Sequence, residues 1–206
     1  MLIKPDVVKR FLVKPVKGVL HVGAHECEER SFYHSMGLDD SSIIWIEALA
    51  RKVDECKRKG IPRVYQAVMT DKDGAEVTFN VSNNVQSSSI LEFGSHARHH
   101  PHVVFTEQQT LKTTTIDSFL LHNKFDPTQF SFWNLDIQGA ELLALKGGAK
   151  ALCYADAVYL EVNTEEVYKG CATLPEIDAF LSTYKLKRVV TDITPYGWGD
   201  ALYVRE

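Results

Sequence analysis

The chain has 206 residues, of which 45% are hydrophobic and 24% charged, so it can bury the core of one folded domain. Its formal net charge of −4 argues against the basic surface that nucleic-acid-binding proteins carry. No window approaches the roughly 18 apolar residues of a membrane span. No signal-peptide pattern follows Met1, so we expect a cytoplasmic protein.

Strand-like and helix-like segments alternate along the chain. Residues 1–17 hold two X-Pro steps, at Pro5 and Pro15, and predict an N-terminal extension with one short helix. Beyond it, apolar or alternating runs predict strands, and helical patterns ending in glycine predict helices. The expected strands cover 18–22, 43–47, 63–68, 76–81, 130–137, 157–162, 187–192 and 200–204. The expected helices cover 26–36, 50–59, 116–122, 140–146 and 175–184.

Two stretches break this alternation. Residues 82–89 are polar, and residues 94–109 are irregular and rich in histidine. Loops of this length in a compact domain are usually functional or mobile, so we expect 82–112 to form an active-site and substrate loop. The rest predicts a single α/β domain over residues 1–206, with a mostly parallel sheet and helices on both faces.

The first predicted strand leads through Gly23 into a helix, the opening unit of nucleotide-binding α/β folds. Gly23 lets the backbone turn sharply and approach a ligand because it has no Cβ. Glu47 ends the second strand 24 residues later. This is close to the spacing of about 20 expected for an acid that binds ribose hydroxyls. The pair predicts a cofactor site at the carboxyl edge of the sheet.

The residues after Gly23 indicate which cofactor this is. A dinucleotide fingerprint needs two further glycines, where this chain has His25 and Glu28. A pyrophosphate would also be repelled by Glu26, Glu28 and Glu29. A cationic sulfonium ligand suits these acids better. The sequence therefore favours S-adenosylmethionine over NAD.

Four segments of the chain resemble the FkbM family of methyltransferases: 18–25, 82–89, 113–117 and 134–148. The last segment, Asp-Ile-Gln-Gly-Ala-Glu followed by Leu-Lys-Gly, is the most specific. The chain departs from the family pattern at His21, where an Asp is usual, and at His25, where an Asn is usual. The resemblance implies a Rossmann-like class I methyltransferase with a seven-stranded sheet and a final antiparallel strand. It also implies O-methylation of a sugar hydroxyl in a glycan or glycoconjugate.

The resemblance further implies roles for individual residues. Glu47 would bind both ribose hydroxyls, and Asp136 would lie beneath the transferred methyl group. The implied cofactor contacts are Gly23, Ala24, His25, Glu28, Glu47, Ala48, Ala67, Val68, Ser88 and Asp136. The implied contacts to a carbohydrate acceptor are Gln86, Gln138, Asn163 and Trp198.

The chemistry calls for a base, because a sugar hydroxyl is a weak nucleophile and its proton must be removed. We expect Asp136 to take this proton or orient the group that does, with Glu161 and His25 as the other candidates. Asp136, Glu161 and Asn163 could instead hold magnesium, but we expect no metal. The four histidines of 96–102 fit an exposed substrate-side loop better than a metal site.

Two other functions stay open on the sequence alone: an NAD-dependent oxidoreductase, and a methyltransferase-like binding module without turnover. Gly23, Glu47 and Asp136 speak against the second. The chain could be a complete protein or one domain of a larger glycan-assembly protein.

Overall fold

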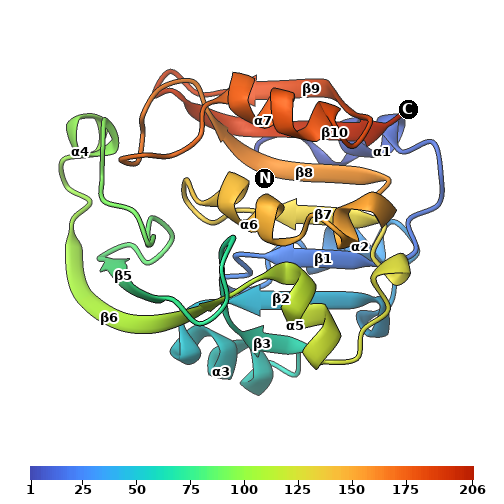
Figure 1. Ribbon diagram of the computed structural model, residues 1–206, viewed down its shortest axis with the longest axis horizontal. Helices are drawn as coiled ribbons and strands as arrows, with labels where there is room; N and C mark the ends of the chain where they lie inside the picture. The colour runs from blue at the N-terminus through green and yellow to red at the C-terminus, as the bar shows by residue number, and fades with distance from the viewer.

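A seven-stranded sheet forms the centre of the protein (Figure 1). The computed structural model describes all 206 residues. The strand order is β3-β2-β1-β7-β8-β10-β9, and only β10 runs antiparallel to its neighbours. The strands are β1 (Val19–Val22), β2 (Ile43–Glu47), β3 (Val64–Gln66), β7 (Phe132–Leu135), β8 (Ala157–Asn163), β9 (Leu186–Ile193) and β10 (Trp198–Arg205). The predicted fold class, with its antiparallel last strand, is confirmed.

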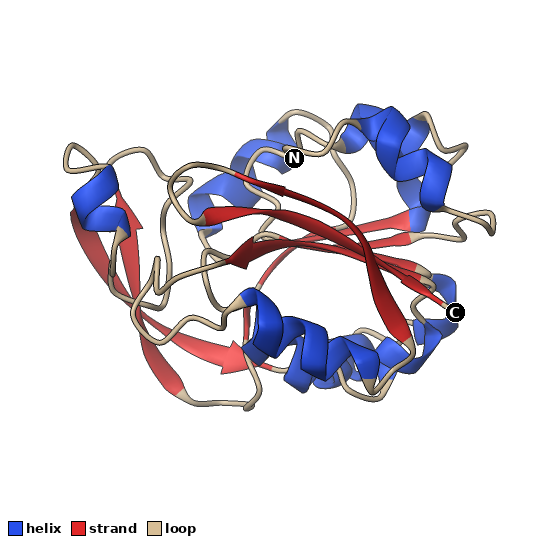
Figure 2. Ribbon diagram, turned by 90° about the horizontal axis from the view of Figure 1, so that it is seen from above, coloured by secondary structure: helices blue, strands red, loops and turns tan.

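Helices cover both faces of this sheet, as Figure 2 shows. They are α1 (Pro5–Phe11), α2 (Arg30–His34), α3 (Ala50–Arg58), α5 (Ile116–His122), α6 (Glu141–Gly147) and α7 (Leu174–Ser182). Side chains alternate along a strand, so β1 supplies both cores: Leu20 and Val22 to one, Val19 to the other. Both faces are buried, which explains why the central strands are largely apolar, with His21 and Asn134 as buried polar exceptions. None of the helices combines the length and the apolar character needed to cross a membrane.

A second, three-stranded sheet in the order β4-β6-β5 lies beside the first, together with the short helix α4 (His96–His99). Its strands are β4 (Val68–Met69), β5 (Glu76–Ser82) and β6 (Phe105–Thr114). The expectation of an irregular segment over 94–109 was wrong, because it contains α4 and the start of β6. The polar residues of β6 are mostly exposed, so this strand carries no buried apolar run that the sequence could reveal.

The segment before α2 also differs from the expectation. The helix predicted over 26–36 is limited to Arg30–His34, because His25 (φ 43°) and Cys27 (φ 60°) adopt left-handed conformations that a helix does not admit. Glu26 and Glu28 therefore lie in the turns that lead to α2, and Glu29 is its N-cap residue. These three acids therefore precede the first turn of α2 instead of forming it.

The other expected helices are present with small shifts at their ends. The helix expected at 116–122 matches α5, and the Thr115 hydroxyl caps it by accepting a hydrogen bond of 3.1 Å from the Ser118 N–H. Helix α7 begins with a capping box formed by Thr173 and Glu176. The strand expected over 63–68 is divided, because β3 joins the large sheet and β4 joins the small one.

Candidate active site

One cavity of ≈ 530 Å³ opens at the carboxyl edge of the large sheet. The carboxyl ends of β2 and β7 point towards the side of the molecule where β5, β6 and α4 lie (Figure 1). Six carboxylates and five histidines line the cavity, and no lysine or arginine does. The carboxylates are Glu28, Glu29, Glu47, Asp136, Glu161 and Asp200, and the histidines are His21, His25, His96, His100 and His102. Such a cavity favours a cationic ligand over an anionic one.

Gly23 brings the ends of β1 and β7 together at the base of the cavity. Its φ of +88° is a conformation in which side chains are strained, and an added Cβ would lie 1.8 Å from the backbone oxygen of Asp136. The Gly23 N–H donates to the Ile46 carbonyl at 2.8 Å, which ties the same turn to β2. Only glycine allows this arrangement, which positions Asp136.

Replacing Gly23 with alanine should therefore destabilise the protein by about 3–5 kcal/mol, the range of severe steric replacements. A chain of this size should then melt about 6–20 °C lower, which thermal denaturation would measure. Gly37→Ala is the matched control, because Gly37 has a φ of +85° but nothing within 4 Å of an added Cβ. A similar loss in both variants would show that conformational strain, and not the contact with Asp136, is what requires glycine.

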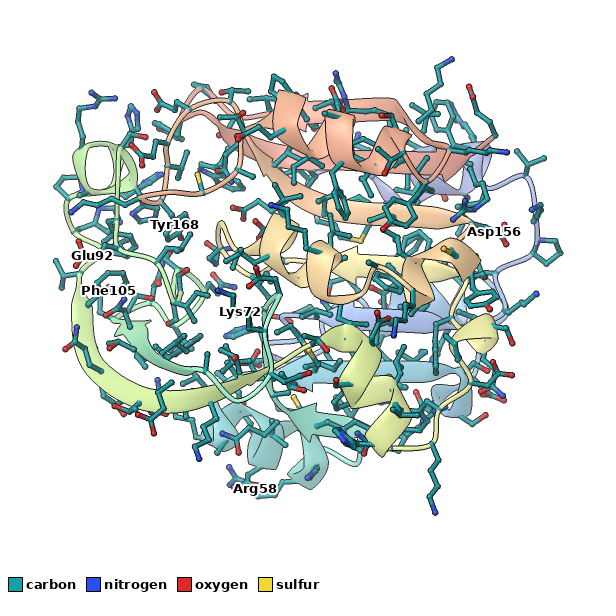
Figure 3. All side chains as sticks on the ribbon, in the orientation of Figure 1. Arg58, Lys72, Glu92, Phe105, Asp156 and Tyr168 are labelled. Carbon is teal, nitrogen blue, oxygen red and sulfur yellow. The ribbon has the colours of Figure 1, made fainter.

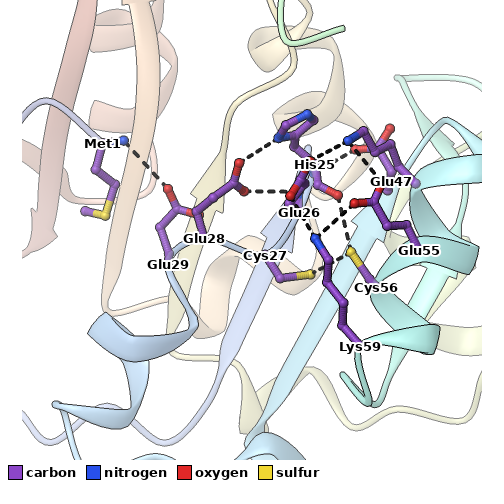
Figure 4. A network of polar contacts seen from close by, with 11 residues as sticks. Met1, His25, Glu26, Cys27, Glu28, Glu29, Glu47, Glu55, Cys56 and Lys59 are labelled. Atoms are coloured by element: carbon purple, nitrogen blue, oxygen red, sulfur yellow. Dashed lines mark hydrogen bonds and ion pairs between the residues drawn. The ribbon is translucent and has the colours of Figure 1, made fainter.

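Glu47 lies at the end of β2, 8% exposed, and is fixed by two backbone groups (Figure 4). Its Oε2 accepts a hydrogen bond from the His25 N–H and its Oε1 from the Leu49 N–H, both at 2.9 Å. Each carboxylate oxygen can accept a second hydrogen bond, so both remain able to accept one from a ligand in the cavity. This geometry suits a pair of adjacent hydroxyls, as in a ribose.

The acids after β1 have different partners. The His25 Nδ1 pairs with the Glu28 Oε1 at 2.6 Å, and this hydrogen bond raises the pKa of His25 above its usual value. Glu26 accepts hydrogen bonds from Lys52 at 2.7 Å and Lys59 at 2.8 Å and does not line the cavity (Figure 4). His25 is therefore the side chain of the cavity best placed to carry a positive charge.

Gln138 joins two carboxylates of the cavity through one amide group. Its Nε2 donates to the Asp136 Oδ1 at 2.6 Å and to the Glu161 Oε2 at 2.8 Å. The Tyr168 hydroxyl donates to the Gln138 Oε1 at 2.6 Å, and the Ser89 hydroxyl donates to the Gln138 carbonyl at 2.8 Å. With the amide oxygen bound by Tyr168, the NH₂ group must face the two acids. Gln138 adopts a φ of 57°, unusual for a residue other than glycine, which these contacts maintain.

The two acids that Gln138 binds, Asp136 and Glu161, both have raised pKa values. Asp136 is open to the cavity but deep in the fold, and removal from bulk water, together with repulsion by Asp200, raises its pKa to about 6. Burial, followed by repulsion from Asp136, raises the pKa of Glu161 well above its usual value. Glu161 therefore holds its proton more tightly than a free carboxyl group does, whereas Asp136, with a pKa of about 6, is mostly ionised at pH 7. A carboxylate with a pKa near the operating pH suits general-base chemistry.

Replacing Gln138 with leucine should raise the pKa of Asp136, because the amide donor that favours its charged form is lost. If Asp136 is the base, the pH at which turnover is half-maximal should move upward, which a pH–rate profile would measure. Tyr168→Phe removes only the hydrogen bond to the amide oxygen and should move the midpoint less. An unchanged midpoint in Gln138→Leu would show that the Gln138 amide does not affect the pKa of the group that controls turnover.

The far wall of the cavity comes from the region of α4, from the segment after β8 and from the start of β10. Most of the residues expected at the site line the cavity: Gly23, His25, Glu28, Glu47, Ala48, Ala67, Val68, Gln86, Ser88, Asp136, Gln138, Glu161 and Trp198. Ala24 and Asn163 do not; both are about 1% exposed. No group of three or more His, Cys, Asp or Glu residues is placed to hold a metal ion. The roles of the individual residues stay predictions.

The structure adds Tyr168 and Asp200 to the residues expected from the sequence. Asp200 of β10 lies opposite Glu161 of β8 in the register of the antiparallel pair, and it accepts a hydrogen bond from the Tyr159 hydroxyl. To place Asp200 at the site from the sequence, one would have to know the register of β10 against β8, and no local sequence pattern reveals that register. Tyr168 lies in the segment after β8, on the side of the molecule where α4 lies (Figure 3).

Comparisons with known proteins agree with this geometry. The family described as "Methyltransferase FkbM domain" matches residues 21–188. The 2-O-methyltransferase NoeI of Sinorhizobium fredii is 22% identical over 187 residues, covering 85% of this chain and 75% of that protein.

Two solved structures resemble the chain at 12% identity. One is a protein of the NADB-Rossmann superfamily from Streptococcus agalactiae (TM-score 0.52, covering 100% of this chain and 68% of the other). The other is Sp1610 of Streptococcus pneumoniae (TM-score 0.50, 100% and 70%). These two show a shared fold. The match over residues 21–188 shows more: the chain belongs to the FkbM methyltransferase family, and its class is that of the S-adenosylmethionine-dependent methyltransferases.

Proposed function

We propose that this protein transfers a methyl group from S-adenosylmethionine to a hydroxyl of a sugar, in a glycan or glycoconjugate. The observation that carries the proposal is Asp136, an acid at the base of the cavity whose pKa is raised to about 6. The relative NoeI is a 2-O-methyltransferase, which supports transfer to oxygen. A cytoplasmic location stays a prediction.

The cofactor half of the cavity would be formed by residues that follow β1, β2 and β3. Glu47 would accept hydrogen bonds from both ribose hydroxyls, which are charge-assisted and therefore strong. His25, whose pKa is raised, would face the carboxylate of the cofactor's methionine part. Ala67 and Val68 would contact the adenine ring. The carboxylates that line the cavity favour a positively charged sulfonium and would repel the pyrophosphate of NAD.

S-adenosylmethionine supplies a methyl group on a positively charged sulfur, an electrophile that an oxygen nucleophile can attack directly. The protein must then align the acceptor hydroxyl and accept its proton. Alignment alone can contribute up to about 7–11 kcal/mol. Asp136 would accept the proton, since it is open to the cavity and ionised at neutral pH. Glu161, whose pKa is raised, would support Asp136 through the shared amide of Gln138.

The direct test is to incubate the protein with S-adenosylmethionine carrying a labelled methyl group and a panel of methyl glycosides. We expect label in the sugar in a form that resists mild alkali, because a methyl ether survives treatment that hydrolyses a methyl ester. Label that mild alkali releases would contradict transfer to a hydroxyl. Cofactor binding without transfer to any member of the panel would favour a binding module.

A further inference from the structure

The cavity has a second half, away from Glu47, which we call the acceptor wall: His96, His100, His102, Tyr168 and Trp198. These residues come from α4, the segment that follows it, the segment after β8 and the start of β10. The wall is built from aromatic and imidazole rings. Flat rings of this kind stack on the apolar faces of sugars and leave their edges free for hydrogen bonds.

His96 is the most constrained member of this wall. It is 6% exposed, and its ring stacks on Phe93 with centroids 4.3 Å apart and an interplanar angle of 11°. Phe93 in turn stacks on Phe105 at 3.9 Å, so the imidazole is supported by β6. Neither ring nitrogen of His96 makes a hydrogen bond within the chain; Nδ1 is inaccessible to solvent, which leaves Nε2 as the nitrogen that a ligand in the cavity can reach. A polar group without a partner in a largely buried ring costs free energy, so Nε2 of this fixed ring is available to a ligand in the cavity.

The charges around the wall limit what this ligand can be. No lysine or arginine lines the cavity. The ammonium group of Met1, which does line it, pairs with Glu29 at 3.6 Å, and Lys169 pairs with Glu92 at 2.7 Å. Asp136, Glu161 and Asp200 line the same cavity. Burial, and then the neighbouring histidines, lower the pKa of His96 to about 4, so the ring is neutral at pH 7. An anionic acceptor would meet repulsion from these carboxylates and no lysine or arginine to compensate it.

We propose that the acceptor of this methyltransferase is an uncharged polyhydroxylated sugar, and that the His96 imidazole binds one of its hydroxyls. The proposal rests on the proposed function for the identity of the cavity. The Nε2 of a neutral imidazole donates or accepts a hydrogen bond according to its tautomer, and a hydroxyl can do either, so the two are matched without any charge. Sugar phosphates, uronic acids and sulfated glycans are excluded as acceptors.

The test measures equilibrium binding of methyl glycosides to protein saturated with S-adenosylhomocysteine. The panel pairs methyl glucoside, galactoside and mannoside with the methyl glycosides of the corresponding uronic acids. Each pair differs only at C6, where the uronide has a free carboxylate in place of the hydroxymethyl group. We expect at least one neutral glycoside to bind at least 10-fold more tightly than its uronide. Equal or tighter binding of the uronides, or no binding of any neutral glycoside, would overturn the proposal.

Variants of His96 test whether this residue binds the sugar. His96→Phe keeps the ring stack but removes both nitrogens, so it should weaken the neutral glycoside at least 10-fold without changing the affinity for S-adenosylhomocysteine. His96→Gln should restore part of the loss, and His122→Phe, an exposed histidine outside the cavity, is the matched control. His102→Lys adds a cation to the wall and should improve binding of the uronide. Unchanged sugar affinity in His96→Phe would remove His96 from the site.

The two proposals fail in different ways. If S-adenosylhomocysteine does not bind but the wild-type chain still prefers neutral glycosides, the cofactor assignment fails and the sugar site stands. If S-adenosylhomocysteine binds but the preference for neutral glycosides is absent, methyl transfer stands and the acceptor class fails.

Discussion

Replacing Asp136 with asparagine should lower turnover by about 10²–10⁴-fold, the range for loss of a general base. The affinity for S-adenosylhomocysteine should hardly change, because asparagine keeps the shape of the side chain. In the wild type, turnover should rise as the pH increases through about 6, where Asp136 loses its proton. Steady-state rates from pH 5 to 8 would measure this, and unimpaired turnover in Asp136→Asn would remove Asp136 from the mechanism.

The same replacement should stabilise the protein at neutral pH. The pKa of Asp136 is raised on folding, from 3.8 to about 6, so the folded state binds the proton more tightly than the unfolded chain. The stability from this residue is therefore present below pH 4 and lost as the pH rises to about 6. Asp136→Asn should melt higher than the wild type at pH 7, and the difference should vanish near pH 4. Asp71→Asn, at an exposed turn, is the control and should show no such trend.

Replacing Glu47 with glutamine should weaken binding of S-adenosylhomocysteine by about 100-fold or more. Hydrogen bonds to a charged group contribute about 1.5–3 kcal/mol each, and the cofactor would lose two of them. One end of the new amide would also direct its NH₂ group at a backbone N–H, either of His25 or of Leu49, which both need an acceptor. Calorimetric titration would measure the affinity, and the melting temperature should fall as well.

Glu55→Gln is the matched control for Glu47, since Glu55 is an acid of α3 that pairs with Lys52 and Lys59 outside the cavity. It should leave cofactor affinity unchanged, because Glu55 does not line the cavity. Equal affinity in Glu47→Gln and wild type would show that Glu47 only stabilises the turn after β1 and does not bind ribose.

The sequence predicted the central sheet because its strands are buried on both faces. Strands such as β2 and β8 are largely apolar, and their boundaries follow from turn residues on either side. The antiparallel β10 was expected from the resemblance to a family and not from any pattern in the strand itself. Gly23 and Glu47 were found because the chemistry of a βα turn requires them at those positions.

The small sheet and the far wall of the cavity could not be predicted in the same way. Strand β6 is polar and pairs with β5 across a long separation in sequence, so its existence depends on tertiary contacts. Tyr168 and Asp200 reach the cavity only through the path of the chain after β8 and the register of β10. The turn at His25 and Cys27 shortened α2 because two residues other than glycine adopt positive φ there, which no propensity indicates.

The central claim is that the cavity binds S-adenosylmethionine, and a thermal-shift titration with S-adenosylhomocysteine, with NAD in parallel, tests it most directly. At 100 times Kd a ligand adds about 2.7 kcal/mol, which raises the melting temperature of a chain of this size by about 5–10 °C. We predict this rise with S-adenosylhomocysteine and none with NAD. A rise with NAD alone, or with neither ligand at millimolar concentration, would contradict the account.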